Sequence, residues 1–496
     1  MRRPLVGCVV VIVLGASALG AQLPDAEAAF ARGDYRTARQ MYEHVLALDS
    51  LNSRALYRLA VLDSWDGKLR ESLARFTKLR RVEPLDEDIM VAQARVLSWD
   101  GQTLHAEALY DSVLARSPNR TDALAGRARA VAWSGALNRA ERLWRDALTH
   151  HPNDPEILIG LAQTLDWEGQ PALAESYAAR AREAAPSDRS AQDLLDQVRA
   201  ERASVVSGSV DHADDHDHNQ FTAVNGSYNA SLAGSLRATL HAVWRRNSDP
   251  FLSGTSTGFD VTLARTLSGG ASLRAGLGTR SLNPSTGASR TPLVALVGIG
   301  FRPASFASVG ISYNHTPFDE TAVLVQKGLV WDAVSTEVEL SPRANLSITG
   351  IFDAAWLSDH NRRLLGALAV MQGLGQGGGV HVGVYGRIMG YHNSTFGQGY
   401  FTPDRFSVGE ARLVYGWRRA RWGARIDGGL GVQQVTKSAA SQSEYHAGAT
   451  ISRGFRAIDE LAITGLFTNS AQGRTGTVTT GSYSYWAVGI RYRRGV

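Results

Sequence analysis

The sequence predicts an α-solenoid of helical repeats followed by an antiparallel transmembrane β-barrel of about 16 strands. Three observations support this fold class. Five glycines recur every 34 residues, from Gly33 to Gly169. From about Ser204 onward, apolar residues recur at every second position, which is typical of strands. Glycine itself is unevenly distributed, because 40 of the 50 glycines lie in residues 203–496.

Residues 1–21 have the pattern of a secretory signal peptide. Arg2 and Arg3 form a charged start, and Leu5–Leu14 is an apolar run that is too short to span a bilayer. Small residues then offer a cleavage site before Gln22. We therefore expect an exported protein.

The composition excludes several classes of protein. The single cysteine, Cys8, lies in the predicted signal peptide, so the mature chain has no disulfide framework, thiolate metal site or cysteine nucleophile. The formal net charge of +5 falls to +3 without Arg2 and Arg3. Such a small excess, spread along the chain, argues against nucleic acid as the main partner.

Residues 22–203 form the predicted repeat domain. Besides the glycines, which open turns, two columns of small residues allow helices to cross closely, a bulky column fills the gap to the next unit, and a proline column ends the second helix. These columns are Ala26, Ala60, Ala94, Ala128 and Ala162; Ala38, Ser72, Ala106, Ala140 and Ala174; Tyr42, Phe76, Tyr110, Trp144 and Ala178; and Ser50, Pro84, Pro118, Pro152 and Pro186. The pattern resembles the tetratricopeptide repeat over about residues 22–188, with a capping helix near Ser187–Ala203.

The resemblance implies a concave groove that binds a protein partner. We expect Tyr57, Val91, Ala125 and Ile159 to line this groove, and the partner to be periplasmic.

A further column of tryptophans has two interpretations. Trp65, Trp99, Trp133 and Trp167 each stand two residues before a turn glycine. They could form a ladder of aromatic platforms for sugar rings or peptide. Alternatively, each indole packs within its own hairpin.

Residues 204–496 form the predicted barrel. Apolar and polar residues alternate over several segments, among them Leu236–Arg245, Phe259–Leu263, Leu273–Leu277, Ala307–Asn314, Trp422–Asp427 and Trp486–Arg493. The polar set is rich in Arg, Gly and Ser, as in a wet lumen. The apolar set often ends in an aromatic residue, as at Trp244, Phe301, Tyr313, Trp417 and Trp486, which suits contact with the lipid interface. These features favour a barrel in outer-membrane lipid over a soluble β domain.

The order of signal peptide, repeats and glycine-rich barrel resembles the YaiO-type outer-membrane β-barrel proteins. More broadly, it is similar to exopolysaccharide-export proteins of the outer membrane. Gly399-Tyr400-Phe401-Thr402-Pro403-Asp404-Arg405-Phe406 is similar to the G-Y-F-S-P-x-x-Y/F segment of cellulose exporters. The chain departs from these families in having only five repeats and in ending with Arg493–Val496 after its last aromatic residue.

The same string supplies the candidate substrate-binding residues Tyr400, Phe401, Arg405 and Phe406. If the loop folds into the lumen, its rings could stack on sugar faces and Arg405 could donate to hydroxyl groups. If it is an external hairpin, the rings would cover the barrel rim.

Three other motifs have plain structural explanations. Asp211–His218 offers imidazole and carboxylate ligands, but we expect a solvated turn. Gly254–Gly258 matches the G-x-S-x-G elbow without a following helix, so we expect a loop. Gly373–Gly379 lacks the helix that a dinucleotide motif needs and predicts a hairpin connection. The sequence thus predicts no catalytic site, no metal and no cofactor.

We therefore expect an outer-membrane barrel with periplasmic repeats, which serves the export or assembly of an envelope or extracellular polysaccharide. The alternative is a non-transporting scaffold, in which the barrel anchors the repeats for protein interaction. An enzyme is not expected.

Overall fold

The computed structural model describes residues 23–232, 235–267, 270–304, 306–343, 345–375, 379–394, 399–455, 458–470 and 483–496. The predicted signal peptide lies outside these residues. The chain divides into one unit up to Thr164 with Tyr177–Ala191, and a second of Leu165–Ser176 with Gln192–Val496. Within the described residues, no helix combines the length and hydropathy needed to cross a bilayer.

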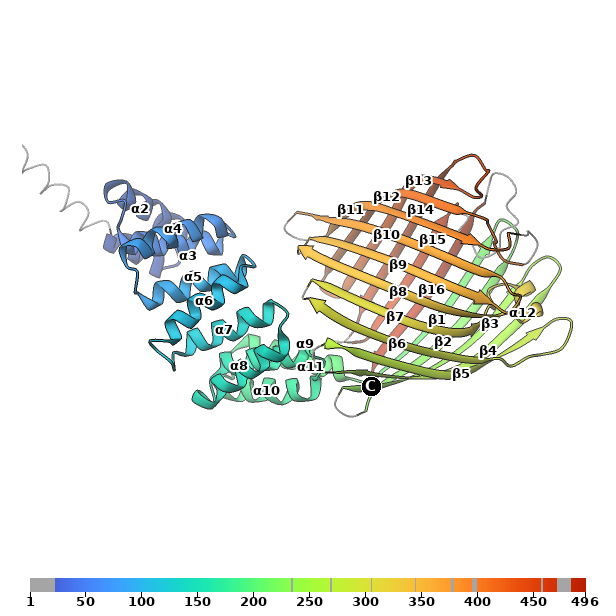
Figure 1. Ribbon diagram of the computed structural model, residues 1–496, viewed down its shortest axis with the longest axis horizontal. Coiled ribbons are helices and arrows are strands. Elements are labelled where there is room, and N and C mark those ends of the chain that lie inside the picture. The colour runs from blue at the N-terminus through green and yellow to red at the C-terminus, as the bar shows by residue number, and fades with distance from the viewer. Residues whose placement is uncertain are drawn as a thin grey trace, which may run out of the picture. The chain divides into compact units, whose positions relative to one another are not determined.

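Antiparallel helices follow one another through the repeat region (Figure 1). They are α2 (Tyr35–Leu48), α3 (Ser53–Trp65), α4 (Leu69–Val82), α5 (Glu87–Trp99), α6 (Thr103–Leu114), α7 (Thr121–Trp133), α8 (Leu137–His150), α9 (Pro155–Trp167), α10 (Pro171–Ala184) and α11 (Arg189–Arg202). The five turn glycines have φ between 73° and 87°, a conformation that costs glycine little. The predicted turns are confirmed.

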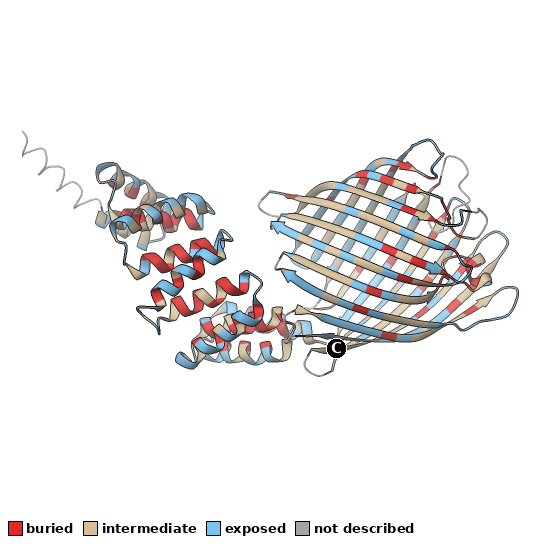
Figure 2. Ribbon diagram, viewed as in Figure 1, coloured by how far each residue is buried: buried red, intermediate tan, exposed pale blue. Residues whose placement is uncertain are grey.

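The predicted columns of small and bulky residues form the core of the repeats. All ten small residues are fully buried, as the red helix faces in Figure 2 illustrate. Tyr42, Phe76, Tyr110 and Trp144 are at most 2% exposed. A Cβ at Gly160 would overlap with the indole of Trp144, and one at Gly126 would overlap with the ring of Tyr110, so these two bulky residues need glycine opposite them.

The second part is a closed antiparallel barrel of sixteen strands in sequence order, which confirms the predicted fold class (Figure 1). The strands are β1 (Val205–Asp215), β2 (Gln220–Ser231), β3 (Leu236–Ser248), β4 (Ser253–Thr266), β5 (Ser272–Pro284), β6 (Leu293–Ala304), β7 (Ala307–Pro317), β8 (Val330–Arg343), β9 (Leu346–Leu357), β10 (Arg362–Leu374), β11 (Val380–Tyr391), β12 (Phe406–Arg419), β13 (Trp422–Gln434), β14 (Gln442–Gly454), β15 (Glu460–Thr468) and β16 (Tyr485–Gly495). β1 closes the barrel by pairing with β16, from Val205 opposite Gly495 to Asp215 opposite Tyr485.

The alternation in the sequence separates the two faces of the barrel wall. Leu240 and Trp244 are 49% and 40% exposed on the outside, whereas His241 and Arg245 face a cavity in the lumen. Large apolar side chains occupy outward positions on strand after strand. An apolar outer surface on a closed barrel is what lipid requires, so the barrel is consistent with an outer-membrane location.

Connections differ between the two ends of the barrel. At the end that holds Val205 and Gly495, β12 and β13 are joined by only two residues, 420 and 421. At the opposite end, residues 318–329 join β7 to β8 and contain the short helix α12 (Ala322–Lys327), and residues 392–405 join β11 to β12. Among the connections that the structure describes fully or for the most part, these two are the longest, and both lie at the same end of the barrel.

Candidate functional site

Two long connections pack together against the inner wall of the barrel. Phe318, Leu324 and Leu329 of the β7–β8 connection share one apolar cluster with Tyr400 and Phe401 of the β11–β12 connection. We call it the loop cluster; its remaining buried members are Leu357, Met389, Tyr391, Phe406, Val408 and Val435. Because Phe406 and Val408 begin β12 and point inward, the cluster narrows the lumen at this end.

The loop cluster contradicts the proposed sugar platforms. Tyr400, Phe401 and Phe406 are 2%, 4% and 0% exposed. Tyr400 lies edge-on to Phe318 at 5.4 Å between ring centroids, and Phe401 lies edge-on to Phe406 at 5.7 Å. Since other side chains cover these rings, the prediction that they stack on sugar is wrong, and their role is packing.

The fourth candidate, Arg405, is also engaged within the chain. Its Nη2 donates to Oε1 of Gln434 at 2.9 Å. The side chain is half-buried and held toward the wall at β13. Arg405 is therefore a contact between the β11–β12 connection and the barrel wall.

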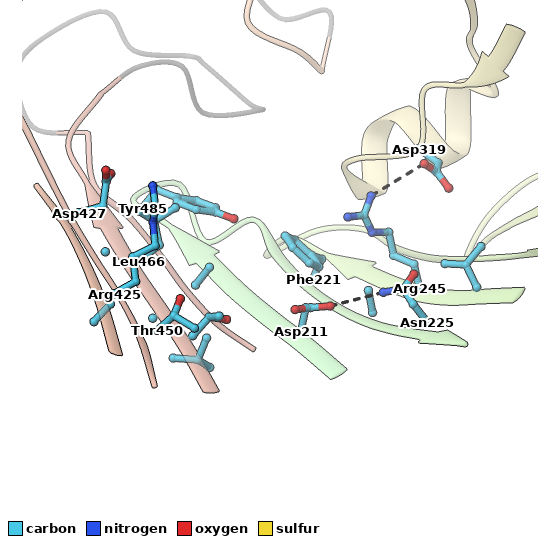
Figure 3. A pocket seen from close by; sticks show the side chains of 18 of the residues that line it. Asp211, Phe221, Asn225, Arg245, Asp319, Arg425, Asp427, Thr450, Leu466 and Tyr485 are labelled. Atoms are coloured by element: carbon cyan, nitrogen blue, oxygen red, sulfur yellow. Dashed lines mark hydrogen bonds and ion pairs between the residues drawn. The ribbon is translucent and has the colours of Figure 1, made fainter. Parts of the chain in front are cut away.

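Asp319 fastens the β7–β8 connection to the strands beside it. The Ser256 hydroxyl donates to Asp319 Oδ2 at 2.5 Å, and Arg280 Nη1 lies 3.2 Å from the same oxygen. Arg245 Nη1 is 3.9 Å from Oδ1, an ion pair drawn in Figure 3. The Asn247 amide donates to the Asp319 carbonyl oxygen at 2.9 Å. One carboxylate thus holds the connection to β3, β4 and β5.

Tyr400 fastens the other connection. Its hydroxyl donates to Oδ2 of Asp359 at 2.7 Å and accepts from Nδ2 of Asn361 at 3.2 Å. Burial raises the pKa of the Tyr400 hydroxyl, so it stays neutral and remains a donor. Thr321 Oγ1 donates to the Gly399 carbonyl oxygen at 3.2 Å, which joins the two connections directly.

Below these connections lies a polar cavity in the lumen (Figure 3). Its volume is about 640 Å³, and β1–β3, β5 and β13–β16 supply most of its wall. Charged groups of both signs line it, including Asp211, Arg245, Arg280, Arg425 and Asp427. Such a wall offers donors and acceptors to a hydroxyl-rich molecule.

The repeat region has a groove of its own, with a volume of about 520 Å³. Tyr57 and Val91 line it, although Val91 is only 3% exposed. Ala125 is fully buried, so its predicted role in the groove is wrong. Ile159 is half-buried and lies outside this groove.

Charged side chains make up much of the groove wall, which the sequence columns did not indicate. Arg54 and Arg58 both bind Glu27, whose carboxylate also accepts from the Tyr42 hydroxyl at 2.6 Å. The hydrogen bond from Arg58 is the main reason that the pKa of Glu27 falls to about 2. These ion pairs join the first two repeats.

The tryptophan column is partly exposed. Trp65, Trp99 and Trp133 are 54%, 43% and 36% exposed. Trp65 stacks on Phe30 of the preceding hairpin at 5.8 Å and meets Tyr35 edge-on at 5.2 Å. The interpretation that this indole packs only within its own hairpin is therefore wrong.

The other three motifs lie in strands and in the connections next to them. Asp211–Asp215 belong to β1, and Asp215 accepts hydrogen bonds from Asp217 and Asn219 in the turn that follows. Gly254–Gly258 lie within β4 rather than in the expected loop. Gly373–Gly379 span the β10–β11 connection as predicted, although residues 376–378 lie outside the described chain.

One cluster that the sequence did not indicate could hold a metal ion. Atoms of Glu410, Glu444 and His446 lie within 4.8 Å of one another. Glu444 and His446 lie two residues apart on β14, and only the register of β12–β14 brings Glu410 of β12 close to them. The sequence does contain a signal for this cluster. It is the set of three segments that pair on successive strands: Glu410-Ala411-Arg412, Gly429-Leu430-Gly431 and Glu444-Tyr445-His446.

Comparison with known proteins identifies the helical part. Residues 134–198 match the tetratricopeptide repeat family model. This stretch of the helical part is thus similar to tetratricopeptide repeats. No curated protein matches the chain.

Solved structures show limited similarity to each part. A structure described as a bacterial polysaccharide outer membrane secretin has 11% identity and a TM-score of 0.47, covering 59% of this chain and 99% of its own. A tetratricopeptide-repeat protein of Thermus thermophilus has 21% identity and a TM-score of 0.32, covering 36% and 98%. YrrB, a repeat protein with an unusual peptide-binding site, has 18% identity and a TM-score of 0.29, covering 35% and 90%.

Proposed function

We propose that this chain is an outer-membrane barrel that serves the export or assembly of an envelope or extracellular polysaccharide. The observation that carries the proposal is the lumen itself: a polar, charged cavity below two connections that are fastened to the wall by a few polar contacts. A hydroxyl-rich polymer can bind to a wall that offers many hydrogen-bonding groups. The fastened connections would act as the constriction that keeps the membrane sealed between export events.

The orientation follows from the lengths of the connections. Outer-membrane barrels have short periplasmic turns and longer extracellular loops. The short β12–β13 turn lies at the end where β1 begins, directly after the repeats in sequence. We infer that the repeats lie in the periplasm, where their groove binds a protein partner, and that the loop cluster faces the cell exterior.

Protease treatment tests this orientation. Protease added to intact cells should spare residues 22–202 and should digest them once the outer membrane is permeabilised. Cleavage of the repeats on intact cells would contradict the orientation.

The runner-up is a non-transporting scaffold, and the loop cluster is the observation that favours it. Eleven buried apolar side chains at one end of the lumen could close the barrel permanently. The barrel would then only anchor the repeats and their protein partner.

A deletion strain separates the two functions. If the chain serves export, loss of the gene should lower cell-surface and released polysaccharide while polymer or precursor accumulates inside the envelope. Complementation with the full chain should restore release. Unchanged polysaccharide in the deletion strain would favour the scaffold.

A further inference from the structure

Two glycines on β13 bring side chains of β12 and β14 together across the strand between them. Gly431 stands between Glu410 and Glu444, and Gly429 stands between Arg412 and His446. A Cβ at Gly429 would overlap with the imidazole of His446 and with Glu410 Oε2. The neighbouring Leu430 is 73% exposed on the outer face, so the two glycines face the lumen.

The side chains that meet over these glycines are deeply buried. Glu410 and Glu444 are 5% and 2% exposed, and the His446 side chain is 9% exposed. His446 Nδ1 lies 2.9 Å from Glu410 Oε2, and the ligand atoms of all three residues lie within 4.8 Å of one another. Oε2 of Glu444 is buried and has no hydrogen-bond partner.

The charge of this cluster is unbalanced. Glu410, Glu444 and Asp427 carry three carboxylates, and within the described residues Arg412 is their only ion-pair partner with a fixed positive charge. Arg412 binds Oε1 of Glu410, which leaves Oε2 facing His446. Burying two facing carboxylates is costly unless a cation or a proton lies between them.

The imidazole is held as in known metal sites. His446 Nε2 lies 2.9 Å from Oδ1 of Asp427, so this nitrogen can donate to the carboxylate while Nδ1 faces the two glutamates. A ligating histidine commonly donates its other ring N–H to a carboxylate, which fixes the tautomer and the ring orientation. Two carboxylates and one imidazole suit a divalent transition ion of the Zn²⁺ type.

We propose that Glu410, Glu444 and Nδ1 of His446 bind one Zn²⁺-type ion in the wall of the lumen, with Asp427 orienting the histidine. Tetrahedral zinc with ligands at about 2.1 Å places ligand atoms about 3.4 Å apart, which small side-chain movements would reach. The ion would bind the lone pair of Nδ1 and cancel the excess negative charge. It would also tie β12 to β14 directly beneath Phe406 and Val408 of the loop cluster.

Zinc binding by the full chain in detergent micelles tests the site. Protein stripped with a chelator and dialysed against zinc chloride should retain one zinc ion more than the Glu444→Gln and His446→Gln variants. His241→Gln is the matched control, because Nδ1 of His241 on β3 lies 3.1 Å from the carboxylate of Asp260 on β4, outside the cluster of Glu410, Glu444 and His446. It should retain as much zinc as the wild type.

Separate measurements report on the assembly of the barrel and on the coordination of zinc. Heat-modifiable electrophoretic mobility shows whether each variant has assembled, and zinc K-edge absorption of the wild type should show oxygen ligands with one imidazole and no sulfur. The proposal would be overturned if E444Q retained as much zinc as the wild type, or if H241Q lost as much zinc as the site variants. A wild-type spectrum without imidazole would also overturn it. If both site variants fail to assemble, the wild-type spectrum alone decides.

Discussion

Arg280 Nη1 lies 3.2 Å from Oδ2 of Asp319, and this ion pair holds the β7–β8 connection against the inner wall of the barrel. Both side chains are largely buried, at 16% and 10% exposure. Removing one partner of a buried pair leaves an uncompensated charge and costs about 3–5 kcal/mol. The attachment of this connection therefore depends strongly on one carboxylate.

Replacing that carboxylate should loosen the constriction. We expect Asp319→Ala to leave an assembled barrel and to make cells several-fold more sensitive to vancomycin, which is too large for ordinary porins. The measurement is the minimal inhibitory concentration in a strain that carries the variant. Asp249→Asn is the control, because Asp249 lies in the β3–β4 connection and accepts from the backbone N–H groups of Phe251 and Leu252 in its own turn. Equal sensitivity of the two variants would contradict the role of Asp319.

Phe401 should hold the β11–β12 connection in place by packing. Phe401→Ala removes a ring that is 4% exposed, and such a change costs about 3–5 kcal/mol when the site cannot collapse. We expect protease to cut the β11–β12 connection of the detergent-solubilised variant while the barrel strands survive. Phe251→Ala removes a ring that is 92% exposed and should have no effect. A resistant Phe401→Ala variant would mean that the loop cluster does not depend on this ring.

The stability of the first repeats should depend on pH through Glu27. Its pKa falls to about 2 in the folded chain, chiefly because Arg58 donates to it. A lowered folded-state pKa stabilises the fold above the ordinary pKa of 4.5, and this contribution is lost as the pH falls toward 2. Glu27→Gln should therefore lower the helical melting temperature at pH 7, with a difference that shrinks between about pH 4.5 and 2.

Circular dichroism at 222 nm follows the helices while the barrel stays folded. The control is Glu141→Gln, which removes one ion pair to Arg145 at 2.8 Å on the surface of α8. Such surface pairs contribute about 0–1 kcal/mol. A Glu27→Gln variant with the same pH profile as the wild type would show that the Glu27 network does not stabilise the repeats.

The periodic parts of this molecule could be predicted from the sequence, because the same residue type recurs wherever the same local backbone geometry or environment recurs. Each turn glycine, from Gly33 to Gly169, has a positive φ that side chains disfavour, so the column reports backbone geometry directly. Likewise, outward residues such as Leu240 and Trp244 alternate with lumen residues because lipid lies on one side only. Both patterns can be recognised in the sequence without knowledge of any contact between distant residues.

The site could not be predicted in the same way, because it consists of contacts between distant residues. Tyr400 and Phe401 form a motif along the chain, but their burial depends on Phe318 in a different connection. Glu410 and His446 meet only because β13 carries glycines between them. The sequence identified the aromatic string but left open whether its rings bind sugar or cover the barrel rim, since their exposure is set by the partner connection.

Single-channel conductance of the purified chain in planar bilayers tests the central claim most directly. We predict small or rare openings for the wild type. A variant in which a short Gly-Ser turn replaces residues 318–329 should open a stable channel with at least several-fold larger conductance. This result would show that the lumen is a conduit closed by the fastened connections. A variant that assembles but conducts no more than the wild type would contradict the account and favour a barrel that only anchors the repeats.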